Sequence, residues 1–442
     1  MKYNVFFIIV PLALLLGYFA WFDALPKWDE TVYMTNARSH VADIKPLEDY
    51  RSPLLEYVIA GIWLVTWESL AAARSLAIAF TLLLVYLFYL ICREYFDSQL
   101  SFWLTMLFSA SPLIITWGYT AYSDIPGLCL IALAFYFIIK DNYTAAGFFS
   151  GAAFLMRFPY GLFAAAVLLY VLLEYKFTRQ MAERIFQYAS TFAIILVPWL
   201  LYNWLHYNNL SWDFRIYQSV IRNYSLNEPI ALFMTRAFWL LIILPAFMLL
   251  GLAQVRKRPK GYGLIVISLA VILGYYLFFV NLKIERYFLS WILFFYLLVG
   301  FGFLWIKINY RKLAMPALVL ALVMAAYTLV PAVAAVQNDI RCKADGALMQ
   351  SVLYLQQRVN PASRILSNTW VYYQYYLGTE SYSLWSPHVG ALISQYSPKY
   401  VIINNQEGEL FDTSLAEQSG RVYIEQEFRD DCGQRVTLYR VK

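Results

Sequence analysis

The chain has 442 residues, of which 61% are hydrophobic, 19% aromatic and only 14% charged. Soluble domains carry about 25% charged residues, so this composition excludes an ordinary soluble protein and indicates many membrane-spanning segments. The net charge of +6 does not indicate a nucleic-acid partner, because residues 337–442 carry ten basic and eleven acidic side chains and the excess lies among the membrane segments.

Long apolar runs follow one another from the N-terminus to about residue 336. They cover 4–22, 71–91, 99–117, 124–139, 185–204, 230–252, 262–280, 287–306 and 313–336. Most have the length of about 20 residues that a helix needs to cross roughly 30 Å of hydrocarbon. Two other regions are ambiguous. Residues 143–173 form either one long helix or a hairpin broken at "MRFPY", and residues 53–67 are short and contain Glu56.

The distribution of Lys and Arg selects among these alternatives, because cytoplasmic loops are enriched in both. With the N-terminus inside, 53–67 at the interface and 143–173 as a hairpin, thirteen Lys and Arg fall in cytoplasmic loops and nine in longer outer loops. We therefore predict a mainly α-helical membrane domain at 1–336, with about eleven spans in the cell membrane and its first outer loop at 23–52. The first span lacks a small-residue cleavage site and is expected to remain as an anchor.

From residue 337 the composition changes to that of a small α/β domain. Helices are expected in "ADGALMQSVLYLQQRV" and "HVGALISQYS", and strands in "SRILSN", "KYVIINN", "RVYIEQEF" and "RVTLYRV". After an odd number of spans, this domain at 337–442 lies outside the cytoplasm. Cys342 and Cys432 lie near its two ends and are candidates for a disulfide in an oxidising compartment; two free thiols are the alternative.

The first outer loop opens with "WDE" and continues with Tyr33, Ala37, Val41 and Ile44 at helical spacing. This pattern predicts an amphipathic helix at the membrane interface. Asp29 is then either the N-cap of this helix or a functional carboxylate. Other charged residues on the predicted outer face are Arg51, Asp124, Arg157, Lys283, Glu285 and Arg286. Acidic and basic side chains are therefore expected to meet at one membrane surface.

In order and spacing, the motifs around these residues resemble those of the C superfamily of membrane glycosyltransferases. The resemblance is to the branch of protein O-mannosyltransferases and aminoarabinose transferases. "WDETVYMTNAR" resembles the first-loop aspartate motif of that branch, and "YSDIPGLCLIALAFYFI" resembles its second motif, "TDMPLLFFLTLALYFL". "ERYFLSWILFF" resembles "PRYLLPLLPAL", and "ILSNTWVYYQYYLGTESYSL" resembles part of the outer domain that some members carry.

Two further motifs resemble the family with substitutions. "YRSPLLEYVIAG" resembles "KPPLYYW", with Arg51 in the place of Lys and Ser52 in the place of the first Pro. "GFFSGAAFLMRFPYGLFA" resembles "GLAFLTKGPVALL", with Arg157 in the place of Lys. Arg preserves the positive charge and offers a planar fork that suits phosphate oxygens. The "WWDYG" element of oligosaccharyltransferase catalytic subunits is missing from the sequence, which disfavours that activity.

The resemblance implies the glycosyltransferase C fold and the transfer of a mannose-like or other hexose or pentose from a polyprenyl-phosphate donor to an acceptor hydroxyl, with inversion. Such a donor is already activated, so transfer needs a base for the hydroxyl and stabilisation of the departing phosphate. Asp29 is implied as the base, and Glu30 as a group that orients acceptor or sugar. The alternative for Glu30 is a solvated acid in the first helical turn.

The residues implied in substrate and lipid-phosphate binding are Arg51, Asp124, Arg157, Lys283 and Arg286. The alternative for each arginine is that its side chain extends to lipid headgroups. Asp124 binds acceptor or sugar hydroxyls, or else caps the helix that Pro126 begins.

No cofactor and no metal are predicted, because His40, His206 and His388 lack metal-ligand spacing and the chain has no Gly-rich phosphate loop. The expected partners are membrane lipid, the polyprenyl-phosphate sugar and a protein, glycan or lipid acceptor. The alternative functions are a transporter or lipid-linked-sugar flippase, with charged groups near mid-membrane, and a non-catalytic assembly subunit that would tolerate the loss of Asp29.

Overall fold

The computed structural model describes residues 4–23, 25–42, 46–223, 244–253, 259–280, 284–344, 346–384, 389–405 and 421–442. The chain folds into two compact units. The helical unit comprises Met1–Ala20, Glu48–Gly61 and Ala71–Ala334. The α/β unit comprises Trp21–Leu47, Ile62–Leu70 and Ala335–Lys442. Most of the first outer loop, which the sequence placed with the domain at 1–336, thus shares a unit with the C-terminal domain.

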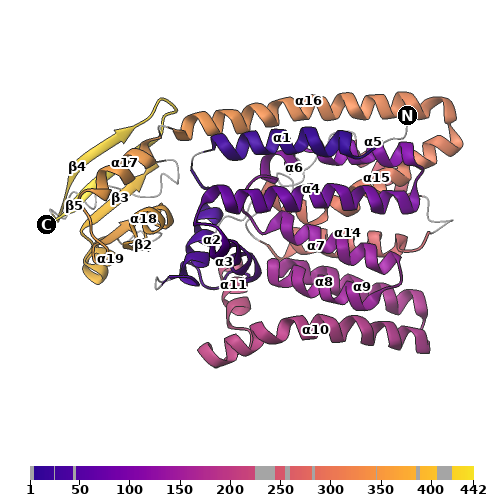
Figure 1. Cartoon of the computed structure of the whole chain (residues 1–442), viewed down its shortest axis with the longest axis horizontal. Helices are drawn as coiled ribbons and strands as arrows, with labels where there is room; N and C mark the ends of the chain where they lie inside the picture. The colour runs from indigo at the N-terminus through magenta and orange to yellow at the C-terminus, as the bar shows by residue number, and fades with distance from the viewer. Residues whose placement is uncertain are drawn as a thin grey trace. The chain divides into compact units, whose positions relative to one another are not determined.

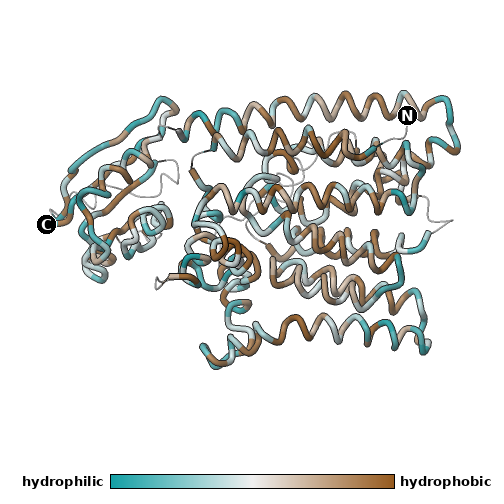
Figure 2. The backbone as a smooth tube through the Cα atoms, in the orientation of Figure 1, coloured by the Kyte–Doolittle hydropathy of each residue, from teal (hydrophilic) through white to brown (hydrophobic). Residues whose placement is uncertain are grey.

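The helical unit consists of helices, most of them apolar (Figures 1 and 2). They are α1 (Phe6–Phe22), α4 (Leu70–Tyr95), α5 (Ser98–Ser109), α6 (Pro112–Trp117), α7 (Asp124–Ile139), α8 (Tyr143–Met156), α9 (Gly161–Tyr175), α10 (Arg179–Tyr207), α11 (Trp212–Asn223), α13 (Leu244–Ala253), α14 (Tyr262–Phe278), α15 (Leu289–Asn309) and most of α16 (Arg311–Ala344). Among the described residues, five helices are long and apolar enough to cross a membrane, and six shorter ones are also apolar. The chain is a mainly helical, multi-pass membrane protein.

The two ambiguous regions have defined structures. Residues 143–173 contain two helices, α8 and α9, because the chain is extended at Arg157 and then forms a single 3-10 turn, Phe158–Tyr160. This break falls at "MRFPY", as the hairpin alternative requires. The helix at 53–67 is α3 (Leu54–Val65), whose 12 residues span about 18 Å and are too short to cross a bilayer. Of the apolar run at 230–252, residues 230–243 lie outside the described part.

Small residues allow α8 to pack closely against α10. Gly147 and Gly151 lie one helical turn apart on α8. A Cβ atom on Gly147 would lie 2.1 Å from the backbone oxygen of Tyr188, and one on Gly151 would lie 2.0 Å from the side chain of Ile195. Glycine at both positions therefore brings the two helix backbones together, as in other membrane proteins.

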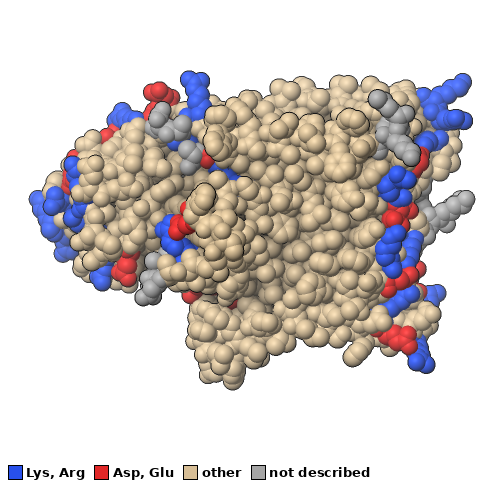
Figure 3. All heavy atoms as spheres, viewed as in Figure 1, with Lys and Arg blue, Asp and Glu red and all other residues tan. Residues whose placement is uncertain are grey.

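Charged side chains gather at one end of the helical unit, where α4 ends and α5 begins, and leave an uncharged belt along the helices (Figure 3). The ion pairs there are Lys140 with Glu94 at 2.8 Å, Arg184 with Asp141 at 3.3 Å, Lys260 with Asp141, and Lys307 with Asp97. We call these residues the charged end. They come from or directly adjoin the segments "REYF", "KDN", "EYKFTRQMAER", "RKRPK" and "KINYRK", which are the loops predicted to be cytoplasmic. These loops therefore meet at one end of the bundle.

The α/β unit contains a five-stranded sheet of order β2-β1-β3-β5-β4. Its elements are α2 (Trp28–Ser39), α17 (Ala347–Gln356), β1 (Arg364–Ser367), α18 (Trp370–Leu377), β2 (Glu380–Ser383), α19 (Val389–Tyr396), β3 (Tyr400–Asn404), β4 (Val422–Arg429) and β5 (Arg435–Val441). β1, β2 and β3 are parallel, whereas β5 runs antiparallel to both of its neighbours. α17 and α18 pack on one core of the sheet through Val352 and Tyr373, and α19 packs on the other through Ile393.

The sequence predicted α17, α19 and four of the five strands. It did not predict α18 or β2. Cys342 at the end of α16 and Cys432 in the turn between β4 and β5 form a disulfide with a Cα separation of 5.7 Å, so the free-thiol alternative does not apply. Cys92 and Cys129 are free and buried.

Candidate active site

Three of the predicted site residues meet in the helical unit. Asp124 is the first residue of α7, and its side chain is 1% exposed. Its Oδ2 atom lies 3.1 Å from Nη1 of Arg157 and 3.6 Å from Nε of Arg286. Two guanidinium groups from segments far apart in the sequence therefore converge on one carboxylate. We call Asp124, Arg157 and Arg286 the arginine pair site.

Aromatic rings enclose the two guanidinium groups. The Cζ atom of Arg286 lies 4.6 Å from the ring centre of Tyr122 and 5.8 Å from that of Trp117. Arg157 lies 5.7 Å from the ring centre of Tyr287, close enough for a cation–π interaction. These rings were not predicted from the sequence, although Tyr122 lies two residues before Asp124 and Tyr287 directly follows Arg286.

Backbone contacts fix the turn that carries Arg157. Tyr160 donates a hydrogen bond from its hydroxyl to the backbone oxygen of Asp124 at 2.7 Å. The amide of Phe158 donates to Oγ of Ser52 at 3.1 Å. The segment that contains Arg51 is therefore attached to the turn that follows α8. Arg51 itself pairs with Glu48, with Nε at 2.7 Å from Oε2.

The arginine pair site has one more positive than negative charge and is shielded from solvent. The side chains of Arg157 and Arg286 are 8% and 12% exposed, and that of Arg51 is 17% exposed. The buried, ion-paired side chain of Arg157 does not extend to lipid headgroups, so that alternative is wrong for Arg157. Oδ1 of Asp124 and Nε of Arg157 are buried and have no hydrogen-bond partner among the described residues. A bound anion with hydroxyl groups could satisfy both atoms.

The site lies at helix ends rather than at mid-helix. Asp124 begins α7, and Lys140 of the charged end directly follows that helix. Arg157 follows the last residue of α8, which begins just after Asp141 of the charged end. The arginine pair site and the charged end are therefore at opposite ends of the same two helices.

A further buried arginine lies on α4. Arg74 is 0% exposed, its Nη1 atom lies 3.5 Å from the backbone oxygen of Ala20, and its Cζ atom lies 5.5 Å from the ring centre of Tyr119. The sequence analysis did not select it, although a single arginine inside an apolar run is itself a signal of a specific role. Tyr119 belongs to the segment that carries Trp117 and Tyr122, so Arg74 supports the rings around Arg286.

In the α/β unit, α2 positions the two acidic residues of "WDE". Lys27 is the N-cap, Asp29 is the second helical residue and Glu30 is the third. Glu30 is 0% exposed and accepts a hydrogen bond from the amide of Lys27 at 2.8 Å. Glu30, rather than Asp29, thus supplies the reciprocal bond of a capping box. The N-cap interpretation of Asp29 and the solvated-acid interpretation of Glu30 are both wrong.

α2 is enclosed by protein, so the prediction of an amphipathic helix at the membrane interface is wrong. Residues 29–37 are all buried. Val32 packs with Leu47 and with Val371 of α18. Because the sequence analysis did not predict α18, it left the second face of α2 without a partner. Asp29 lies in a shielded helix turn.

The charge around Asp29 is mixed. Burial, followed by the positive charge of Lys343, lowers the pKa of Lys27, while the carboxylates of Asp339, Glu30 and Asp23 raise it. Lys283 lies outside the described residues. Within the described part of the chain, the His, Cys, Asp and Glu side chains form no group of three placed to hold a metal ion.

Comparisons with known proteins agree with this architecture. Residues 50–202 match the family model of dolichyl-phosphate-mannose-protein mannosyltransferase. The structure of ArnT from Cupriavidus metallidurans bound to undecaprenyl phosphate superposes with a TM-score of 0.70 at 14% identity, over 98% of this chain and 97% of that one. The chain therefore shares the fold of this ArnT structure.

Two further structures share this fold with the chain. The apo form of the same ArnT gives a TM-score of 0.72 at 12% identity, over 98% of this chain and 97% of that one. The oligosaccharyltransferase of Archaeoglobus fulgidus, tethered to an acceptor peptide, gives a TM-score of 0.59 at 10% identity, over 100% of this chain and 74% of that one. At these identities the likeness concerns the fold alone. No curated protein sequence matches the chain significantly.

Proposed function

We propose that the chain is an integral membrane glycosyltransferase that transfers a sugar from a polyprenyl-phosphate donor to an acceptor hydroxyl on the extracytoplasmic side. The observation that carries this proposal is the convergence of Arg157 and Arg286 on Asp124 at buried helix ends. The mannosyltransferase family model covers two of these three residues. The undecaprenyl phosphate in the ArnT structure supports the donor class.

The two arginines bind the donor phosphate in this proposal. Their charge exceeds that of Asp124 by one, which favours an added anion. Aromatic walls lower the local dielectric and strengthen the attraction to negative charge that develops on the departing phosphate. Oδ1 of Asp124 accepts a hydrogen bond from a sugar or acceptor hydroxyl.

Asp29 is the general base. The acceptor oxygen forms a bond to the anomeric carbon from the face opposite the phosphate, and the hydroxyl proton passes to the carboxylate of Asp29. The bond between the anomeric carbon and the phosphate oxygen breaks, and its electron pair remains on the departing polyprenyl phosphate. The configuration at the anomeric carbon is therefore inverted.

The position of the charges disfavours the transporter alternative. A transport path needs charged groups near the centre of the membrane, whereas the arginine pair site lies where α7 begins and where α8 ends. Arg286 likewise lies in the short 3-10 helix Glu285–Phe288, just before α15.

Donor use by an Arg286→Gln variant tests the proposal. Removing this arginine leaves Arg157 paired with Asp124, so the buried carboxylate keeps a partner. Charge-assisted contacts contribute about 1.5–3 kcal/mol, so we expect the donor KM or Kd to rise by roughly 10- to 100-fold. Arg215→Gln on α11, an exposed arginine, is the matched control. The assignment of Arg286 to the donor phosphate is wrong if Arg286→Gln has the same donor KM and Kd as this control.

Labelling of single cysteines in intact cells tests the proposed orientation. His40 and Gln357 are exposed in the α/β unit, and Arg179 at the start of α10 has a 92% exposed side chain. We expect a membrane-impermeant maleimide to modify His40→Cys and Gln357→Cys in intact cells, and Arg179→Cys only after permeabilisation. Modification of Arg179→Cys in intact cells, or protection of either other site, contradicts the orientation.

A further inference from the structure

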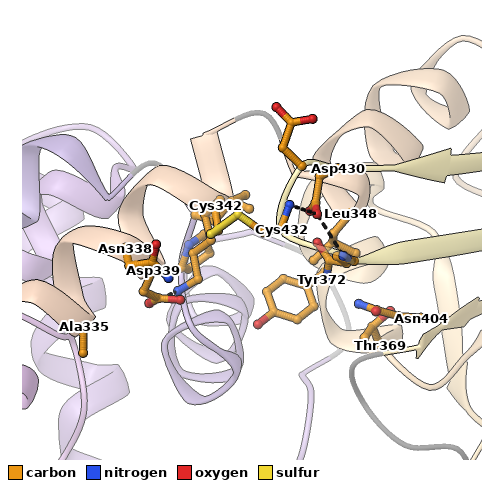
Figure 4. A pocket seen from close by; sticks show the side chains of 15 residues that line it. Ala335, Asn338, Asp339, Cys342, Leu348, Thr369, Tyr372, Asn404, Asp430 and Cys432 are labelled. Atoms are coloured by element: carbon orange, nitrogen blue, oxygen red, sulfur yellow. Dashed lines mark hydrogen bonds and ion pairs between the residues drawn. A yellow bond between two sulfur atoms is a disulfide. The ribbon is translucent and has the colours of Figure 1, made fainter.

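The α/β unit contains a cavity of about 680 Å³, within the range of roughly 300–1,000 Å³ that is usual for small-molecule sites. Figure 4 shows the ring of Tyr372 projecting into the space between the end of α16 and the ends of two strands, with Asn404 at the end of β3 and Asp430 directly after β4. The Cys342–Cys432 disulfide forms part of its wall.

The cavity lies where an open α/β sheet binds ligands. β1 lies between β2 and β3, all three parallel. The connection from β1 to β2 passes through α18 on one face, and the connection from β2 to β3 passes through α19 on the other. The strand order therefore reverses between β1 and β3, and ligands bind outside the carboxyl ends of strands at such a point. Thr369, two residues after β1, and Asn404, the last residue of β3, both line the cavity.

Hydrogen bonds make this crevice rigid. The side chain of Asn368 accepts from the amide of Asn404 at 2.9 Å and donates to its backbone oxygen at 2.7 Å, which joins the ends of β1 and β3. On the other wall, Oδ1 of Asp430 accepts from the amides of Cys432 at 3.0 Å and Gln434 at 2.8 Å, and Oδ2 accepts from the amide of Ala347 at 3.3 Å. The site is thus formed before a ligand enters.

The lining favours a neutral ligand rich in hydroxyl groups. Asn338, Asn404, Gln434 and Thr369 each offer both a donor and an acceptor, as sugar hydroxyls require. Lys343 neutralises Asp339 at 2.7 Å, and backbone amides use the carboxylate of Asp430. Three carboxylates, of Asp339, Asp430 and Asp431, thus face one ammonium group in the lining, and this negative charge disfavours a phosphate.

A peptide ligand fits the cavity less well. A peptide in extended form commonly adds a strand to a free sheet edge. β3 and β5, whose ends adjoin the cavity, are each paired on both sides, and the edge strands of the sheet are β2 and β4.

We infer that this cavity binds a saccharide, and that the saccharide is part of the acceptor; the second statement rests on the proposed function. Pro26 lines the cavity and precedes Asp29 by three residues, so the Cα atoms of the two residues are at most about 11 Å apart. Trp28 also contacts Tyr372, with ring centres 6.3 Å apart. The same segment thus joins the cavity to the proposed base.

Saturation-transfer NMR on the purified full chain tests the inference. The probes are mannotriose, maltotriose and chitotriose, with inorganic phosphate and a Ser/Thr-rich peptide as comparisons. The protein is held in amphipol, because maltoside detergents are themselves saccharides. Gln434→Leu removes a polar lining group, and Ala335→Trp fills the cavity from α16. The controls are Gln357→Leu, exposed on the same unit, and Ala334→Trp, exposed and outside the lining.

We expect at least one oligosaccharide to receive saturation from the wild-type protein and both controls. Its affinity should fall about three- to tenfold in Gln434→Leu, and its signal should be lost in Ala335→Trp. The inference is overturned if no oligosaccharide binds, if binding survives both cavity variants, or if phosphate or peptide binds in their place. Binding is measured without donor, so the two proposals can be tested separately. A chain that binds saccharide but transfers no sugar would support the saccharide site and contradict the proposed function.

Discussion

Conversion of Asp29 to Asn distinguishes a catalytic role of this carboxylate from a structural role. Asn keeps the shape of the side chain but cannot take a proton. A general base contributes about 10²- to 10⁴-fold to the rate, which corresponds to about 2.7–5.4 kcal/mol at roughly 1.36 kcal/mol per factor of ten. Asp29 is not the N-cap of α2, so the substitution removes no capping bond and its structural cost includes the lost attraction to the helix N-terminus. That attraction is about 0.3–1 kcal/mol, and up to about 2 kcal/mol in partly buried sites.

Thermal stability and transfer rate should therefore respond differently to Asp29→Asn. We expect Asp29→Asn to melt within a few degrees of wild type and to bind donor normally, while its rate of sugar transfer from a synthetic polyprenyl-phosphate sugar falls by at least about a hundredfold. Thr35→Val is the matched control, since Thr35 is buried in the same helix and its hydroxyl donates to the backbone of Thr31 at 2.8 Å. This control should lose about 1 kcal/mol of stability and retain its rate. A near wild-type transfer rate in Asp29→Asn would refute the base assignment.

Three further predictions concern single contacts. Glu30→Ala should lose about 0.5–2 kcal/mol of stability with the capping bond, whereas Glu30→Gln should melt like wild type; a catalytic role for Glu30 would appear as a lost transfer rate in Glu30→Gln. Reduction of the Cys342–Cys432 disulfide, or Cys432→Ser, should lower the stability of the α/β unit by about 2–5 kcal/mol in thermal melts, and an unchanged melt would contradict this. Arg51→Ala should raise the donor KM strongly, whereas Arg51→Lys should keep part of donor use, because Lys retains the charge. A donor KM that is the same in Arg51→Ala and Arg51→Lys would contradict a contact between Arg51 and the phosphate.

The membrane class and most helices could be predicted because they depend on local composition. The apolar runs and the distribution of Lys and Arg identified both the helices and the loops that meet at the charged end. The hairpin at 143–173 could also be predicted, since it is the alternative that keeps the Lys and Arg residues concentrated in cytoplasmic loops. The number of spans depends on lengths measured against a membrane and remains a prediction.

Elements with a conflicting local signal could not be predicted. α18 is built from "WVYYQYYL", whose aromatic residues also favour strands, and it is a helix where it packs on α2 and on the sheet. Without α18, α2 was expected to lie against lipid. The assignment of the cap also depended on a helix boundary that sequence patterns place only to within one or two residues.

The individual residues of the site could be predicted, but not which of them lie together in space. Asp124 and Arg157 were selected from their motifs, and nothing local indicates that Arg286, 162 positions after Asp124, completes the same ion-pair group. The surrounding rings of Tyr122 and Tyr287 follow only from the packing of helices.

Ser52 has a consequence for protein engineering. Replacing unusual residues with those most frequent in a family commonly stabilises a protein, and the related motif has proline at this position. Here the Ser52 hydroxyl is the acceptor for the buried amide of Phe158, in the turn that holds Arg157. Proline would leave that amide without its bond, at a cost of about 1–3 kcal/mol. Consensus design at this position would therefore destabilise the chain, because Ser52 and the turn after α8 are adapted to each other.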